Sequence, residues 1–352
     1  MKITEQFLIK NIFSLPLKLP KISTFNRVSN WIINLDPRLS ICFLLFSYLF
    51  LGITVLGFNR TPVQILTTSL SACLFEMALF YFFKERKLIF PLSALITSFS
   101  LSLLLNYSHN NYLLLVPVFF AIGSKYLLTF KGRHMLNPAQ AGVSFSLIFC
   151  GHLMTSSPAY QWNGIGSMGA FIAGFGLFFL VPKVKRFPLV ISFLVTFTLQ
   201  TLFRAWLMKH HLPFATLFFG TLTSPAFFLF TFFMITDPAT SPKDTKGQVI
   251  TGITLALLDL IFHIKQSYYT FFYAGLTLQL GKLFYSHIKE LKNEGFDTFR
   301  TKLLPYLYRV VVLGLVALIG LGIYKTQISP RLEYIGIQFS FNSIPAQGSG
   351  LG

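Results

Sequence analysis

Met135-Leu-Asn-Pro-Ala139 and Met234-Ile-Thr-Asp-Pro-Ala239 are the two stretches that decide how this chain folds. Each places a polar residue and a proline where one apolar span passes into the next, and Asn137 and Asp237 lie 100 positions apart. Proline interrupts regular helical hydrogen bonding and leaves backbone groups without partners. Lipid cannot satisfy such groups, so we expect both breaks to line a cavity or a site inside the protein.

The composition is that of a polytopic membrane protein. Of the 352 residues, 53% are hydrophobic and 11% are charged, whereas soluble domains carry about 25% charged residues. A formal net charge of +18 would indicate nucleic-acid binding in a soluble protein. Here the basic residues concentrate in alternate connecting segments, so the expected partner is the lipid bilayer and not nucleic acid.

Apolar windows predict an all-α membrane protein with 10–11 transmembrane helices. A full crossing takes about 20 residues, and two of the predicted spans look short, which suits broken or tilted helices. These two spans are 91–106 and 247–263. The complete set is 39–58, 62–83, 91–106, 112–130, 138–154, 164–181, 187–207, 214–235, 247–263, 267–287 and 307–324.

The distribution of Lys and Arg predicts the orientation. Of the 29 basic residues, 22 fall in segments on one side of the predicted spans, six fall on the other side, and Lys125 falls within a span. Cytoplasmic loops carry such an excess, so we expect a cytoplasmic N-terminus and an extracytoplasmic C-terminus in a bacterial inner membrane. Both proline breaks then face the cytoplasm.

Five segments follow from this threading. The main transmembrane domain covers 39–287, after a cytoplasmic N-terminal segment at 1–38. A cytoplasmic amphipathic linker at 288–306 leads to an additional transmembrane helix at 307–324, and an extracytoplasmic tail occupies 325–352.

Several motifs together resemble the NqrB/RnfD family, the large membrane subunits of ion-translocating NADH:quinone and ferredoxin:NAD oxidoreductases. Their order and spacing match across roughly residues 40–285. The motifs are Phe90-Pro-Leu-Ser-Ala-Leu-Ile-Thr97, Gly123-Ser-Lys-Tyr126, His134-Met-Leu-Asn-Pro-Ala-Gln-Ala-Gly142 and Phe233-Met-Ile-Thr-Asp-Pro-Ala-Thr-Ser-Pro242, with Lys246-Gly247.

The resemblance implies two inverted five-helix repeats, partner subunits of a redox complex, and flavin. In the family an FMN is joined to a Thr or Ser of a Ser-Gly-Ala-Thr-like segment, and some members hold riboflavin. The corresponding loop here, about 155–163, lacks that segment. We therefore expect FMN or riboflavin to be bound non-covalently. The short loop and Asp36-Pro37-Arg38 resemble the divergent branch labelled UnbU.

Asn137 and Asp237 are the first candidate site residues, although Asn or Asp before Pro is also a common helix cap or turn residue. Hydroxyl groups around the second break could cap exposed amides or contact a phosphate or ribityl chain. Ser93 and Thr97 either allow close helix packing or line a slot for a flat ring. The predicted cofactor-binding residues are Ser93, Thr97, Asn137, Pro138, Thr236, Asp237, Pro238, Thr240 and Ser241.

Charged residues inside apolar spans form a second candidate set, because they are costly in hydrocarbon. Glu76 lies in mid-span and could pair with Lys125, or with Asp259 or His263. Glu76, Lys125 and Asp259 are therefore predicted to form an ion path or a structural intramembrane pair. No spacing of His or Cys indicates a metal site, and no motif indicates a catalytic residue.

The predicted function is that of a membrane subunit in a redox-driven electron-transport complex, an electron relay within an ion-translocating oxidoreductase that binds flavin in a cavity between broken helices. One-electron transfer needs such a cofactor. The alternative is a secondary transporter that uses the same inverted-repeat scaffold without redox activity, because paired broken helices are equally expected there.

Overall fold

The computed structural model describes residues 37–323, except 56, 59, 88–89, 108–110, 152, 157–165 and 266. The predicted tail, nearly all of the predicted N-terminal segment and most of the loop at 155–163 lie outside the described residues.

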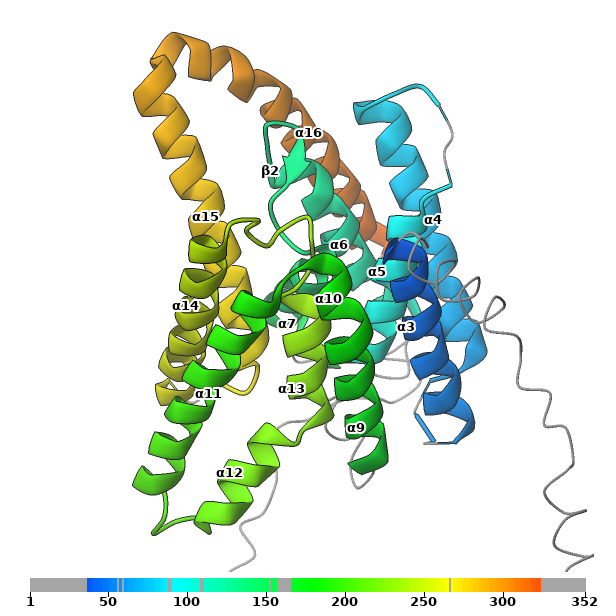
Figure 1. Cartoon of the computed structure of the whole chain (residues 1–352). Coiled ribbons are helices and arrows are strands. Elements are labelled where there is room, and N and C mark those ends of the chain that lie inside the picture. Colours follow the sequence, from blue (N-terminus) through cyan, green and yellow to red (C-terminus); the bar gives the residue numbers. More distant parts are fainter. Residues whose placement is uncertain are drawn as a thin grey trace, which may run out of the picture.

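The described chain is a succession of apolar helices, and each of the predicted spans falls on a helix or a run of helices (Figure 1). In chain order the helices are α3 (Pro37–Thr54), α4 (Pro62–Phe83), α5 (Leu92–Leu104), η1 (Asn111–Leu114), α6 (Leu115–Leu127), α7 (Pro138–Cys150), α9 (Gly166–Phe175), η2 (Gly176–Leu180), α10 (Val181–Val184), α11 (Phe187–Leu207), α12 (Phe214–Leu222), α13 (Pro225–Leu229), η3 (Phe230–Met234), α14 (Thr245–Ile264), α15 (Thr270–Glu294) and α16 (Phe296–Ile323).

The chain is an all-α polytopic membrane protein, as the sequence predicts. Among the described residues α4, α11 and α14 are each long and apolar enough to cross a membrane. Helix α12 and the segment Phe227–Met234 meet the same criterion as a pair bent by 42°, the geometry of a broken span or a re-entrant loop. The remaining spans fall mainly on shorter apolar helices. The predicted inverted repeat stays a prediction, although the second and fourth helices of each half pack together: α4 on α6, and α11 on α14.

Two boundaries differ from the sequence-based expectation. The ninth span is not short, because α14 begins at Thr245, capped by Asp244, whose side chain accepts a hydrogen bond from the Gly247 amide at 2.7 Å. The segment 288–306 is helical but is not a separate linker helix. It is divided at Gly295, where a φ of +79° ends α15 and α16 begins.

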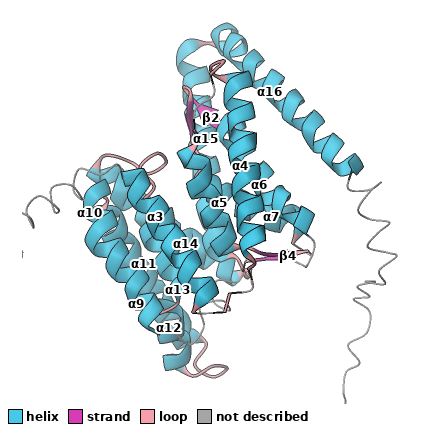
Figure 2. Ribbon diagram, turned by 90° about the vertical axis from the view of Figure 1, so that its right-hand side faces the viewer, coloured by secondary structure: helices cyan, strands magenta, loops and turns pink. Residues whose placement is uncertain are grey.

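Two short strand pairs lie in the connections that follow α5, α6 and α7 (Figure 2). Strand β1 (Asn106–Tyr107) pairs antiparallel with β4 (Met154–Thr155), and β2 (Thr129–Phe130) pairs with β3 (Arg133–His134). Lys131 and Gly132 between β2 and β3 have φ angles of 48° and 75°. Two positive φ angles in a two-residue loop suit a tight hairpin, which fixes the approach of the chain to the first proline break.

Two π-helical segments pack against each other, and the second of them, η3, leads to the second break. Segment η2 packs on η3, and a β-carbon at Gly176 would lie 2.4 Å from the β-carbon of Phe232, so only glycine permits this approach. A π-turn shifts the helical register and is frequent at functional sites. Here η3 turns the chain into the loop that carries Asp237.

Candidate functional site

The first break is a capped helix start. The side-chain oxygen of Asn137 accepts a hydrogen bond from the Gln140 amide at 3.2 Å, and Pro138 occupies the first helical position of α7. The backbone amide of Asn137 donates to Oε1 of Gln279 on α15 at 3.0 Å. The capping interpretation of Asn137 is therefore confirmed, and the amides of Asn137 and Gln140 have partners within the protein.

The second break is a loop and not a helix start. One carboxylate oxygen of Asp237 accepts from the Ala239 amide at 3.1 Å, and the other accepts from the Thr240 hydroxyl at 3.2 Å. The hydroxyl of Ser241 donates to the backbone oxygen of Asp237 at 2.7 Å. Pro238 thus sits in a turn that holds the carboxylate in place, and the next helix begins only at Thr245.

The two breaks meet. Nδ2 of Asn137 lies 3.4 Å from Oδ2 of Asp237 and 3.5 Å from the backbone oxygen of Met234. The structure therefore brings together two residues that are 100 positions apart. The side-chain amide of Asn137 lies between the Asp237 carboxylate and the N-terminal end of α7.

Both breaks line one cavity of about 230 Å³. Of the nine residues predicted to bind a cofactor, all except Thr240 and Ser241 line it. The hydroxyl groups of those two residues instead donate hydrogen bonds to Asp237. The cavity walls are mainly apolar and include Leu103, Leu229 and Phe233.

The cavity has a buried end and an open end. Asn137 and Thr236 are 9% and 1% exposed, so the inner end is closed by the protein. Arg38, Ser93 and Pro238 line the same cavity and are exposed, so the opening lies beside them.

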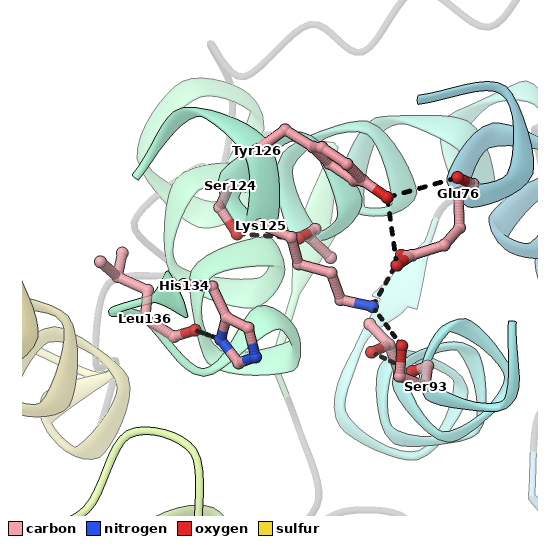
Figure 3. A network of polar contacts seen from close by, with 9 residues as sticks. Glu76, Ser93, Ser124, Lys125, Tyr126, His134 and Leu136 are labelled. Atoms are coloured by element: carbon pink, nitrogen blue, oxygen red, sulfur yellow. Dashed lines mark hydrogen bonds and ion pairs between the residues drawn. The ribbon is translucent and has the colours of Figure 1, made fainter. Parts of the chain in front are cut away.

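One wall carries a buried ion pair, the first of the pairings left open by the sequence. Nζ of Lys125 lies 2.7 Å from Oε2 of Glu76 and 3.1 Å from the Ser93 hydroxyl. The side chains of Lys125 and Glu76 are 8% and 12% exposed. Figure 3 shows Lys125 reaching from α6 toward α4 and α5, with the Tyr126 hydroxyl on the other side of the carboxylate. Lys125 lines the cavity, and Glu76 holds it there.

Arg186 supports the second break from the corner between α10 and α11. Its Nε donates to the Ser241 hydroxyl at 2.7 Å, and Nη1 donates to the backbone oxygen of Val184 at 3.1 Å. Loss of hydration lowers the pKa of Arg186, and the charge of Asp237 acts in the opposite direction. Sequence reasoning treated Arg186 only as a loop cation and missed this contact.

The third predicted ion-path residue, Asp259, lies elsewhere. Nε2 of Gln200 on α11 donates to Oδ2 of Asp259 at 2.9 Å, and Nε2 of His263 lies 3.4 Å from the same oxygen. None of these residues lines the cavity. The predicted ion-path set is therefore divided between two separate clusters.

Arg38 and His134 also line the cavity, although the sequence analysis did not select them as site residues. His134 lies in the motif of the first break, three residues before Asn137, and this position is the signal that could have identified it. Arg38 is distant from both breaks in sequence, and only the fold brings it to the cavity. Nδ1 of His134 lies 3.0 Å from the Leu136 backbone oxygen. Among the described residues no group of three His, Cys, Asp or Glu side chains could hold a metal ion.

The donor set fits the ring system of a flavin. The ring needs flat apolar walls, hydrogen-bond donors for its carbonyl groups and an acceptor for its imide N–H. The cavity offers Lys125 and Ser93 as donors and Asp237 as an acceptor. A volume of about 230 Å³ is below the roughly 300–1,000 Å³ of pockets that enclose drug-sized ligands. A cavity of this volume can enclose only part of a cofactor as large as FMN.

Comparison with known proteins bears on the second half of the chain. Residues 161–276 match the model of the NQR2, RnfD, RnfE family. The matched segment contains the Asp237 break and helices α11 and α14, and the divergent branch within the family stays a prediction. A search of the curated proteins gave no match. The chain is thus a multi-pass membrane protein whose residues 161–276 are similar to the NQR2, RnfD, RnfE family.

Proposed function

We propose that this chain is a membrane subunit of a redox-driven electron-transport complex and that it binds FMN or riboflavin non-covalently between the two proline breaks. The family match favours such a subunit. The observation that carries the proposal for flavin is the meeting of Asn137 and Asp237 at one apolar-walled cavity.

The residues of this chain supply binding and electrostatics. A bound flavin would supply one- and two-electron transfer, which these side chains cannot perform by themselves. Asp237 can accept a hydrogen bond from the imide N–H of the ring, and Lys125 can donate to a ring carbonyl. Because Glu76 and Ser93 hold the Lys125 ammonium at the wall, its position is set before a ligand arrives.

Several residues act by keeping the site in shape. The backbone amide, the side-chain amide and the side-chain oxygen of Asn137 each already have a hydrogen-bond partner. Its role is therefore to position the second break against α7 and not to contact the ligand. Thr240, Ser241 and Arg186 fix the loop from which the Asp237 carboxylate faces the cavity. Buried Leu103 and Leu104 exclude water from the inner end.

The test is an absorbance spectrum of protein purified gently in mild detergent, followed by denaturation and mass analysis of what is released. We expect a flavin spectrum, with the flavin released intact. Asp237→Asn is expected to lower flavin occupancy, because it replaces the carboxylate acceptor.

The matched control is Asp244→Asn, which changes an exposed capping aspartate just beyond the same loop and outside the cavity. It is expected to keep the wild-type occupancy. A colourless protein that releases no flavin would overturn the proposal. Substrate-dependent uptake into liposomes by such a protein would instead support a carrier on the same scaffold.

A further inference from the structure

A second polar cluster lies within the membrane-spanning helices at the far end of α14 from the cavity. Asp259 follows Thr245 by 14 residues, which places it about 20 Å along the helix from the second break. Gln200 on α11 donates to its Oδ2 at 2.9 Å. The Asp259 side chain is 1% exposed, whereas that of His263, one turn later, is 26% exposed.

This cluster has unused hydrogen-bonding capacity. Oδ1 of Asp259, Oε1 of Gln200 and Oγ1 of Thr201 are buried and make no hydrogen bond within the described part of the chain. Nη1 of Arg204, a hydrogen-bond donor, is also buried and makes no hydrogen bond within the described residues. Buried polar atoms without partners are costly, and intramembrane ionisable residues are rare outside functional sites. The unpartnered oxygen of Asp259, together with the unpartnered oxygen of the Gln200 amide that bonds the same carboxylate, indicates a site for an exchangeable group.

The charges around Asp259 limit what that group can be. Arg204 faces it from α11, His263 faces it from α14 itself, and α15 contributes the uncharged Thr270, whose hydroxyl lies 3.3 Å from Nε2 of His263. Arg204 already provides a positive charge that opposes binding of a metal cation. A proton can instead form a covalent O–H bond on the carboxylate, next to a ring that carries protons at two nitrogens.

We propose that His263 and Asp259 form a proton-binding relay that connects the surface at the end of α14 with the membrane interior. A proton from water binds Nδ1 of the His263 ring. The proton on Nε2 then passes to Oδ2 of Asp259, so that one N–H bond breaks, one O–H bond forms and the ring is neutral again. Arg204 favours the carboxylate form and makes the step reversible.

The Glu76 cluster shows why Asp259 is the exchanging group. Both oxygens of Glu76 have partners, and its counter-charge lies at 2.7 Å. Protonating Glu76 would break that ion pair, whereas protonating Asp259 adds a donor where unpartnered acceptors are present. The relay does not depend on flavin, because none of its residues lines the cavity.

The experiment is infrared difference spectroscopy of the full chain in lipid nanodiscs during a jump from alkaline to acidic pH. We expect a carboxylic-acid carbonyl band that is present in wild type and lost in Asp259→Asn. His263→Gln is expected to slow the appearance of that band, because the partly exposed ring delivers the proton. Asp244→Asn, an exposed aspartate on the same helix, is the control and keeps both the band and its rate.

Two results would overturn the relay. One is a wild-type spectrum that equals that of Asp259→Asn in the carboxylic-acid region, since Asp259 would then never bind a proton. The other is an unchanged rate in His263→Gln, which also decides the matter if Asp259→Asn does not fold. Neither result depends on whether flavin is found in the cavity.

Discussion

The two intramembrane polar clusters of this protein use similar residues in different ways. In the first, Glu76 and Lys125 form an ion pair at 2.7 Å, and Ser93 and Tyr126 satisfy the remaining groups. In the second, Oδ2 of Asp259 accepts a hydrogen bond from Gln200 and lies 3.4 Å from His263, while Oδ1 has no partner within the described part of the chain. One cluster is closed and stands beside the cavity, while the other is open and stands at the opposite end of α14.

The difference shows how burial of charge can serve structure or exchange. A buried pair whose carboxylate oxygens both have partners has little freedom to change protonation, and it fixes a cation where a ligand is expected. A carboxylate with spare acceptors and a partly exposed histidine beside it can bind and release a proton. Of the predictions below, ordered from the largest expected effect to the smallest, the first and the last test that contrast, and the two between them test the packing of the proline breaks beside the closed cluster.

Removing one member of the closed pair has the largest expected effect. Lys125→Met leaves the Glu76 carboxylate buried without its counter-charge, which is expected to lower the free energy of unfolding by about 3–5 kcal/mol. Thermal and denaturant unfolding in detergent measure the loss. The double variant Glu76→Gln with Lys125→Met should recover most of it, and a double variant no more stable than Lys125→Met would contradict the closed-pair description.

The next largest effect on stability is expected from a substitution where α7 packs against α15, beside the first break. A β-carbon at Gly275 would lie 1.5 Å from Nε2 of Gln140, whose side chain is held by Gln279 at 2.8 Å. Gly275→Ala is expected to lower the free energy of unfolding by about 1–3 kcal/mol. Gly281→Ala on the same helix meets nothing within 4 Å and serves as the control. Equal stability of the two variants would show that Gln140 moves freely.

Introducing a negative charge at Asn137 tests the contact between the two breaks. Asn137→Asp keeps an acceptor for the cap of α7 but places a second carboxylate next to Asp237, so we expect a loss of about 1–3 kcal/mol in unfolding free energy. Adding Asp237→Asn exchanges the two side chains and should restore stability. If the exchange gives no recovery, the breaks do not depend on their mutual contact.

The smallest effect is expected in the open cluster. Asp259→Asn removes a carboxylate that has few native partners, so the unfolding free energy should change by less than about 1 kcal/mol. The same unfolding assay, run beside Lys125→Met, gives the comparison directly. A loss as large as that of Lys125→Met would mean that Asp259 is a structural ion and that the two clusters are alike.

Sequence reasoning predicted the helices and the cavity well because the signals are local. Apolar runs define the spans, and each polar residue followed by proline marks a point at which a regular helix cannot continue. Asn137 and Asp237 were therefore recognisable as breaks before their contact was known. The pairing of Glu76 with Lys125 was one of several alternatives, since sequence does not give the distance between helices.

Other features depend on tertiary contacts that leave no local pattern. Arg186 resembles any loop cation, yet it binds Ser241 across 55 positions of sequence. The environment of Asp259 depends on Gln200 and Arg204 from another helix. The division at Gly295, by contrast, has a local signal, because a glycine with a positive φ commonly ends a helix, but the apolar windows that defined the spans do not detect it.

The central claim is that the cavity between the two breaks takes a flavin ring, and a titration of purified protein with FMN and riboflavin tests it most directly. Ser100→Phe fills the cavity, while Thr67→Phe makes the same change on the exposed face of α4. Each hydroxyl bonds only to a carbonyl of its own helix, so the pair is matched. We predict that flavin fluorescence is quenched by wild type and by Thr67→Phe but not by Ser100→Phe. Equal quenching by all three proteins, or none by wild type, would contradict the account.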